Sequence, residues 1–182
     1  MTLTYDEVMA ALEAAGTEQT RRTYRRHGAG EPLFGVKFGD LRPLGKKIGT
    51  DHALAEQLWA SGNTDARLLA CMVADPAEVS EDELDTWLAD IDTYFLVDTF
   101  VAEIASKTPG RLERAQRWIA SDRDRTAQAG WDLMNYVALS DEDVPDGLFE
   151  AQLALIAERI ESYGNWTRRS ASNTITGIGL RN

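Results

Sequence analysis

The sequence predicts an all-α protein, and three observations lead to that prediction. Strand signals are nearly absent, because the one glycine-punctuated aromatic stretch, residues 32–39, is short and reads as a loop with extended character. Elsewhere, apolar residues recur at the spacing of one face of a helix. Capping residues stand where these segments begin and end. Together these patterns indicate about eleven helices.

Capping residues bound the first five predicted helices. Thr17 is an N-cap and Gly28 ends the helix that follows it. Asp40 starts the third helix, Gly49 ends it, and Asp51 opens the fourth. The five helices are expected at residues 5–14, 17–27, 39–49, 51–61 and 64–74.

The remaining six helices follow from the same signals. Ser80 stands three residues before Glu83, the spacing of a capping box. Pro109 closes the long apolar helix that comes next. These helices are expected at residues 80–91, 93–106, 110–121, 123–139, 146–162 and 167–178.

From residue 51 onward the predicted helices form pairs, each a first helix, a short turn and a second helix. Trp59, Trp87 and Trp118 fall near the ends of first helices, so the pattern recurs roughly every 30 residues. Repeated helix hairpins of this length are typical of an α-solenoid of the HEAT or armadillo type. We expect one domain over residues 1–182, with N-terminal helices in 1–50 and helix-pair repeats in 51–182. The tryptophans, Trp131 included, are expected in the core between repeats.

The charge balance limits the kinds of partner. Lys and Arg number 19 against 30 Asp and Glu, a formal net charge of −11, and the sequence pI is near 4.6. That balance argues against a generic nucleic-acid binder. The distribution is uneven: residues 1–50 hold 8 basic and 6 acidic side chains, residues 51–160 hold 8 and 23, and residues 161–182 hold 3 and 1. Any site for a polyanion must therefore be assembled locally.

The single cysteine and the hydropathy pattern indicate a cellular setting. Cys71 lies in an apolar run and is expected to be a buried hydrophobe in a protein of a reducing compartment. No N-terminal stretch has the pattern of a signal peptide, and no apolar run approaches the length that spans a bilayer. These features predict a soluble, cytoplasmic protein with no membrane partner; separately, we expect a monomer.

Charged residues recur at the start of the second helices. Successive second helices line the concave face of a solenoid, so their charges would converge on one groove. The alternative for each charge taken alone is a solvated helix start. The residues are Arg67, Asp98, Arg125, Arg168 and Arg169.

Several short motifs resemble the DNA alkylation repair (AlkD-like) family over most of the chain. One set is similar to the opening of that family, and a second set is similar to its last helix, in which an Asn-x-x-Arg start leads to an Ile-Gly end. The motifs lie at residues 35–42, 54–59, 65–70, 165–169 and 175–179.

The resemblance implies a right-handed superhelix of HEAT-like repeats whose concave face cradles duplex DNA. Active members are glycosylases that release N3- or N7-alkylated purines from the duplex without base flipping. The alkylated base carries a positive charge that weakens its glycosidic bond, so the resemblance implies no cofactor. A fixed carboxylate would stabilise the oxocarbenium-like transition state, and aromatic rings would add cation–π contacts.

The resemblance also implies roles for particular residues. The family's catalytic motif has an aromatic residue four positions before an aspartate, which matches Tyr94 and Asp98. Active members usually carry tryptophan at the aromatic position, so Tyr94 is a departure. Arg125 takes the position of the phosphate-binding arginine, and Asp122 and Asp124 beside it are a second departure, since they could pair with it or repel phosphate.

Other basic residues are candidates for contacts with the DNA backbone. Arg168 and Arg169 are expected to bind phosphates, as are Lys46 and Lys47. The basic run at residues 21–26 would be an electrostatic clamp in a solenoid that cradles DNA, and a solvated helix face otherwise. A further aromatic contact would come from Trp166 or Trp131.

Alternatives to these roles stay open at the level of sequence. Asp98 could be a structural carboxylate bonded to Arg67 or Arg125, and Tyr94 could be core. A catalytically inactive HEAT-repeat scaffold would bind a protein partner or undamaged or structured DNA. His27 and His52 have no third ligand in the sequence nearby, so no metal site is expected. Phosphoryl transfer and Ser or Cys hydrolysis have no motif here.

Overall fold

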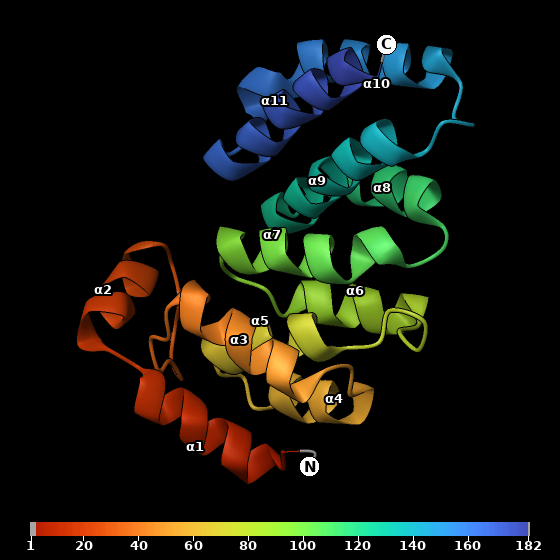
Figure 1. Ribbon diagram of the computed structural model, residues 1–182. Coiled ribbons are helices and arrows are strands. Elements are labelled where there is room, and N and C mark those ends of the chain that lie inside the picture. Colours follow the sequence, from red (N-terminus) through yellow and green to blue (C-terminus); the bar gives the residue numbers. More distant parts are fainter. Residues whose placement is uncertain (1–2, 182) are drawn as a thin grey trace. The chain divides into compact units, whose positions relative to one another are not determined.

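The computed structural model describes residues 3–181, and over that range the protein is all-α, as the sequence predicts (Figure 1). No helix in the described range is long and apolar enough to cross a membrane. Eleven α-helices and two short 3-10 helices make up these residues, with no strand among them. In chain order they are α1 (Tyr5–Ala15), α2 (Glu18–Arg26), α3 (Phe38–Ile48), α4 (His52–Ala60), α5 (Thr64–Val73), α6 (Glu81–Ala89), α7 (Tyr94–Glu103), η1 (Ala105–Lys107), α8 (Arg111–Ile119), α9 (Asp124–Ser140), α10 (Asp146–Arg159), η2 (Ile160–Ser162) and α11 (Asn165–Leu180).

Capping side chains set the starts of five of the eleven α-helices in residues 3–181. The side chains of Thr17, Asp51 and Ser80 each accept a hydrogen bond from a backbone N–H in the first turn of α2, α4 and α6. Asn63 does the same at α5. These contacts explain why the predicted starts lie within one residue of the observed ones.

Three of the predicted helices end or begin differently. The predicted helix 93–106 is interrupted at Ile104, whose backbone (φ −122°, ψ −70°) leaves the helical region before η1. The predicted helix 146–162 tightens into η2 over its last turn. The last helix begins at Asn165, two residues earlier than predicted, so Trp166 lies inside α11.

The chain divides into two compact units, the first ending at Ile104 and the second beginning at Ala105. In the first unit, α4 packs against α5, and the helices α3, α5 and α7 pack in succession. Trp59 and Trp87 are stacked with ring centroids 4.3 Å apart and planes 6° apart. Both are buried, which confirms that these tryptophans belong to the core between helix pairs.

A buried aspartate fixes the N-terminal part of the first unit. Asp65, which is 0% exposed, accepts hydrogen bonds from the backbone N–H groups of Phe34, Gly35 and Val36 at 2.7, 2.9 and 2.7 Å. Gly35 has φ +79°, and a Cβ there would lie 2.6 Å from the backbone nitrogen of Arg21. This loop therefore lies directly against α2, and Asp65 determines where α2 sits.

In the second unit, α9 packs along both α8 and α11. Gly130 makes the contact with α8 close, since a Cβ at this position would lie 2.5 Å from the backbone nitrogen of Ile119. Trp118 and Trp131 are buried, as predicted. The Thr174 hydroxyl donates to the carbonyl of Trp131 at 2.8 Å, which ties α11 to α9.

The environment of Cys71 predicts an unreactive thiol. Its side chain is 2% exposed, and burial, assisted by the negative charge of Glu103, raises the thiol pKa far above its ordinary value. Thiolate is the reactive form, so we expect no reaction with Ellman's reagent at pH 8 until the protein unfolds. Absorbance at increasing urea measures this, and fast labelling without urea would contradict the buried placement.

Candidate nucleic-acid interface

The pair Tyr94 and Asp98 occupies the start of α7. Tyr94 is the first residue of the helix and Asp98 follows one turn later; both are half-buried. Residues four apart lie on the same face of a helix, so the phenol ring and the carboxylate share one face of α7. The spacing in the sequence predicted that these two side chains share a helix face.

Four aromatic rings, from Tyr24, His27, Tyr94 and Phe95, join α2 to the start of α7; we call them the aromatic cluster. Tyr94 meets His27 edge-on at 5.4 Å and Phe95 edge-on at 5.6 Å. Phe95 stacks on Tyr24 at 4.8 Å. Tyr94 packs against neighbouring rings and is still only half-buried. The two interpretations of Tyr94 from the sequence, a site residue and a packing residue, are therefore compatible.

The hydroxyl of Tyr24 fixes the orientation of α2. It donates a hydrogen bond to the backbone carbonyl of Val36 at 2.8 Å. Burial, together with the negative charge of Asp65, raises the pKa of Tyr24 to about 12. The hydroxyl therefore stays protonated at all physiological pH values and keeps this bond.

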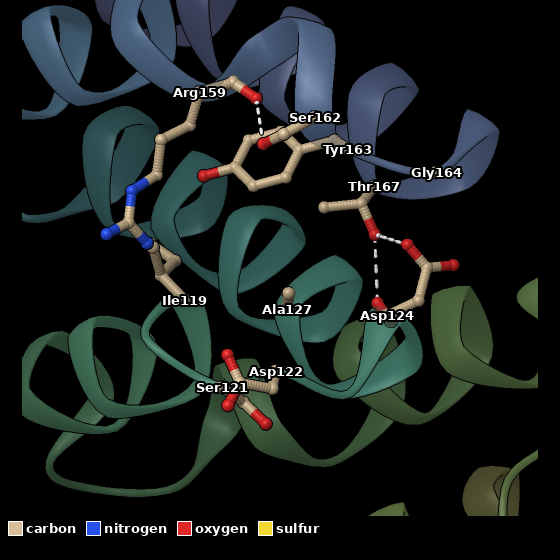
Figure 2. Close-up of a pocket in the computed structure, with 10 residues that line it drawn as sticks. All are labelled: Ile119, Ser121, Asp122, Asp124, Ala127, Arg159, Ser162, Tyr163, Gly164 and Thr167. Carbon is tan, nitrogen blue, oxygen red and sulfur yellow. Dashed lines mark hydrogen bonds between the residues drawn. The ribbon is translucent and has the colours of Figure 1, made fainter.

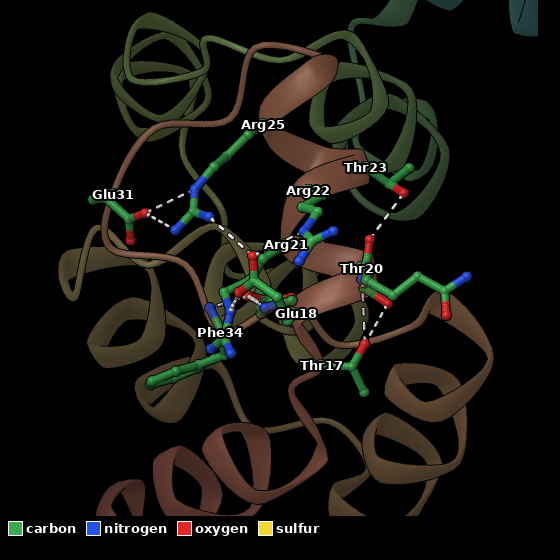
Figure 3. Close-up of polar contacts among 12 residues, drawn as sticks. Thr17, Glu18, Thr20, Arg21, Arg22, Thr23, Arg25, Glu31 and Phe34 are labelled. Carbon is green, nitrogen blue, oxygen red and sulfur yellow. Dashed lines mark hydrogen bonds and ion pairs between the residues drawn. The ribbon is translucent and has the colours of Figure 1, made fainter.

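Helix α2 carries four arginines, and Figure 3 shows three of them beside the carboxylates of Glu18 and Glu31. Arg21 and Arg22 donate to the carboxylate of Glu18 at 3.0 and 3.2 Å, and Arg25 donates to Glu31 at 2.5 Å. The hydrogen bonds from Arg21 and Arg22 lower the pKa of the Glu18 carboxyl. Two glutamates are thus shared among three arginines.

Arg26 adds a fourth positive charge to α2. It is exposed and makes no ion pair with any residue between Leu3 and Arg181. Exposed ion pairs such as those of Glu18 contribute little to stability, so a phosphate can displace them at little cost. This helix presents a net positive surface in a protein whose overall charge is −11.

The other basic candidates of the first unit lie on α3. Lys46 and Lys47 are exposed in its last turn, where positive charge interacts favourably with the helix dipole. Lys46 and Arg42 line a hollow of about 280 Å³. A guanidinium nitrogen of Arg42 lies 4.0 Å from a carboxylate oxygen of Glu103. The lysines are accessible, and they lie on a helix other than the one that carries the arginines.

Arg67, one of the partners considered for Asp98, is engaged elsewhere. Its guanidinium donates to the backbone carbonyl of Trp59 at 3.2 Å and to the carboxylate of Asp90 at 3.3 Å. It also lies 5.2 Å from the Trp59 ring centroid. Arg67 therefore links the ends of α4 and α6, and it is not the ion-pair partner of Asp98.

In the second unit, Arg125 lies in the first turn of α9 and is half-buried. Its guanidinium donates to the side-chain oxygen of Gln128 at 3.0 Å and lies 3.8 Å from a carboxylate oxygen of Asp124. Asp124 is also hydrogen-bonded by the Thr167 hydroxyl, at 2.6 Å. Asp124 therefore forms an ion pair with Arg125 and also a hydrogen bond with Thr167 of α11.

Arg168 and Arg169 differ in their surroundings. The guanidinium of Arg168 donates to the backbone carbonyls of Ile160, Glu161 and Tyr163 at 3.0, 3.1 and 3.2 Å, so this residue holds the turn before α11. Arg169 is half-buried, with its guanidinium carbon 5.1 Å from the Trp166 ring centroid. Of the two, Arg169 is the one placed beside an aromatic ring.

A cavity of about 420 Å³ lies beside the start of α11 in the second unit. Figure 2 shows Thr167 bonded to Asp124 at its edge, with the hydroxyl of Tyr163 pointing toward the side chain of Arg159. Gly164 is required there, because a Cβ would lie 2.5 Å from the Asp124 carboxylate. The lining combines acidic, basic and hydroxyl groups and contains no residue predicted as a site from sequence.

A comparison with protein families decides the relationship suggested by these residues. The model of the DNA alkylation repair enzyme family matches residues 8–175. The chain belongs to this family. The match runs from α1 to α11 and so includes Tyr94, Asp98, Arg125 and Arg169.

Relatives of this family member match it over almost its whole length. It is 29% identical to uncharacterized protein Lin0241 of Listeria innocua and 28% identical to uncharacterized protein Lmo0209 of Listeria monocytogenes, in each case over 98% of this chain and 80% of the relative. A solved structure at 30% identity has a TM-score of 0.90 over 98% of this chain and 77% of the other. That structure is described as a new family of proteins related to the HEAT-like repeat DNA glycosylases with affinity for branched DNA structures. The protein therefore has the HEAT-like repeat fold.

In this member of the DNA alkylation repair family, sequence reasoning missed three residues of the aromatic cluster. Tyr24 lies on α2 and His27, three residues later, is the C-cap of that helix, a spacing that places both rings on one side of it. Phe95 directly follows Tyr94. The helical spacing of the two α2 rings is the signal that could have indicated a shared aromatic face, although not its partner on α7.

Proposed function

We propose that this protein binds branched DNA, with α2 as the main contact to phosphates and the start of α7 beside it. The similarity that supports this is the solved structure at 30% identity and TM-score 0.90, which is described as having affinity for branched DNA. The observation from this chain is the net positive α2, held against Tyr94 by the aromatic cluster. Arg125 and Arg169 would contribute further phosphate contacts from the second unit.

The charge distribution favours a branch over a straight duplex. With a net charge of −11 the protein as a whole repels DNA, so binding depends on a short basic segment. A short segment reaches few phosphates on a linear duplex, and affinity grows with the number of phosphates neutralised. Where several arms meet, phosphates from different strands are crowded together, and the same arginines reach more of them.

Excision of cationic alkylpurines is the second candidate. Its support is the pair of Tyr94 and Asp98, an aromatic ring and a carboxylate one turn apart. The carboxylate would stabilise the positive charge that develops on the sugar in the transition state. The tyrosine gives less ring area than tryptophan, and its contacts with His27 and Phe95 already occupy part of its surface.

Fluorescence anisotropy with a four-way junction and with a linear duplex of equal length tests the first proposal. At 50 mM salt we expect the junction to bind at least about tenfold more tightly, about 1.4 kcal/mol. Equal affinity for both DNAs would remove the preference for branches, and no binding to either would exclude DNA as the partner.

Single-turnover release of 7-methylguanine from a duplex tests the second candidate. Release that is abolished by Asp98→Asn, in protein that still binds DNA, would establish the glycosylase and its carboxylate. Binding to the junction without release of 7-methylguanine would leave DNA binding, without catalysis, as the only supported function.

A further inference from the structure

Three potential metal ligands meet between α4 and α6. His52 is the first residue of α4, Glu56 follows one turn later, and Glu83 lies in the first turn of α6. The ligand atoms of the three side chains all lie within 4.8 Å of one another. Residues 52 and 56 share one face of a helix by their spacing, but Glu83 is brought to them only by the packing of α6.

The two ring nitrogens of His52 lack good hydrogen-bond partners among residues 3–181. Its side chain is only 11% exposed and its ring lies parallel to that of Trp87, with centroids 6.5 Å apart. Nδ1 is buried and has no hydrogen-bond partner among residues 3–181. Nε2 lies 3.6 Å from Glu83 Oε1, longer than a good hydrogen bond. A largely buried ring with neither nitrogen well bonded is unusual, because burying an unpaired polar atom costs free energy.

We propose that His52, Glu56 and Glu83 bind a divalent transition-metal ion, with zinc as the best fit. One imidazole nitrogen and two carboxylate oxygens are donors that Zn²⁺ accepts at about 2.0–2.2 Å. Donor atoms bound in this way lie about 3.3 Å apart in a tetrahedral site, so small side-chain rotations from the present separations suffice. The nitrogen donor disfavours Mg²⁺ and Ca²⁺, which prefer oxygen ligands.

The surroundings of the three ligands favour a cation. Glu56 and Glu83 line a hollow of about 560 Å³ together with Asp82 and Asp90, and the rings of Trp59 and Trp87 also line it. Asp82 adds negative potential without lying in the ligand group, whereas the charge of Asp90 is offset by its ion pair with Arg67. Three protein ligands leave a fourth position of the ion for water or an added ligand. The bound ion links α4 to α6, which carry the stacked tryptophans of neighbouring helix pairs.

Calorimetric titration of the full chain with ZnCl₂ in a non-chelating buffer tests this site. We expect one saturable site in the wild type and at least tenfold weaker binding in His52→Asn, Glu56→Gln and Glu83→Gln. Asp82→Asn is the matched control, since it removes the same charge from the same helix and the same hollow. His27→Asn controls for the other histidine of the chain. Asp82→Asn should weaken binding by no more than about twofold, because Asp82 supplies charge but no ligand atom, and His27→Asn should retain wild-type affinity.

Two further readouts separate a metal site from a change in folding. Zn²⁺ should raise the melting temperature of the wild type and of Asp82→Asn, and leave that of Glu56→Gln unchanged. Glu56 is exposed, so this variant keeps the fold intact. Co²⁺ should give visible absorption bands that His52→Asn lacks.

Three results would overturn the proposal. These are the absence of saturable Zn²⁺ binding at 100 µM, equal weakening by Asp82→Asn and Glu83→Gln, and full retention of binding in His52→Asn.

Discussion

Replacing Asp65 with alanine is expected to lower the free energy of unfolding of the first unit by about 4 kcal/mol. The carboxylate is 0% exposed and accepts three backbone N–H groups, from Phe34, Gly35 and Val36. Hydrogen bonds to a charged group contribute about 1.5–3 kcal/mol each, and a buried donor left unpaired costs about 1–3 kcal/mol. Partial relaxation of the loop keeps the total below that sum. Urea unfolding followed by tryptophan fluorescence measures the change.

Two further variants show whether the charge or the shape of Asp65 is responsible. Asp65→Asn keeps the shape but offers one oxygen in place of two, and its NH₂ group faces backbone donors, so we expect a loss of about 2 kcal/mol. Asp40→Ala removes an exposed carboxylate of α3 and should change stability by less than about 0.5 kcal/mol. If Asp65→Ala were as mild as Asp40→Ala, the loop at residues 34–36 would not depend on this carboxylate.

The helices could be predicted from sequence because their boundaries are determined locally. Thr17, Asp51 and Ser80 each cap a helix through the residue three positions later, and such contacts can be recognised in a linear sequence. The break at Ile104 could not be predicted in this way, since no glycine or proline marks it. Ile104 is fully buried, so we attribute its non-helical backbone to packing, which a pattern of local residues does not record.

The candidate site was predictable only in part, for a similar reason. Tyr94 and Asp98 are four residues apart, so their shared face follows from helix geometry alone. The contact of Tyr94 with His27 joins residues far apart in sequence, and nothing in either helix indicates the other. Arg168 had the charge expected of a phosphate ligand, but its guanidinium is committed to three backbone carbonyls that only the fold places there.

Reversing two charges on α2, with Arg22→Glu and Arg26→Glu together, is expected to weaken binding to a four-way junction by about a hundredfold at 50 mM salt. Both side chains are exposed, and Arg26 makes no ion pair with any residue from 3 to 181, so the fold should not suffer. Loss of two phosphate contacts at about 1.4 kcal/mol each gives the hundredfold change. The slope of log K against log[salt] should also fall by about 2. Anisotropy titrations over a range of salt concentrations measure both quantities.

A matched reversal in the second unit distinguishes a local site from an effect of net charge. Lys107→Glu with Arg117→Glu makes the same change in total charge at two exposed positions that lie outside the proposed contacts. We expect it to weaken binding only a few-fold at 50 mM salt, because neither side chain is a proposed phosphate contact and the remaining effect is that of net charge, which salt screens. If both double variants lost affinity equally, the repulsion of an acidic protein would explain the loss. A loss confined to the α2 variant would instead mean that a short basic helix overcomes the acidity of the rest of the chain at close range.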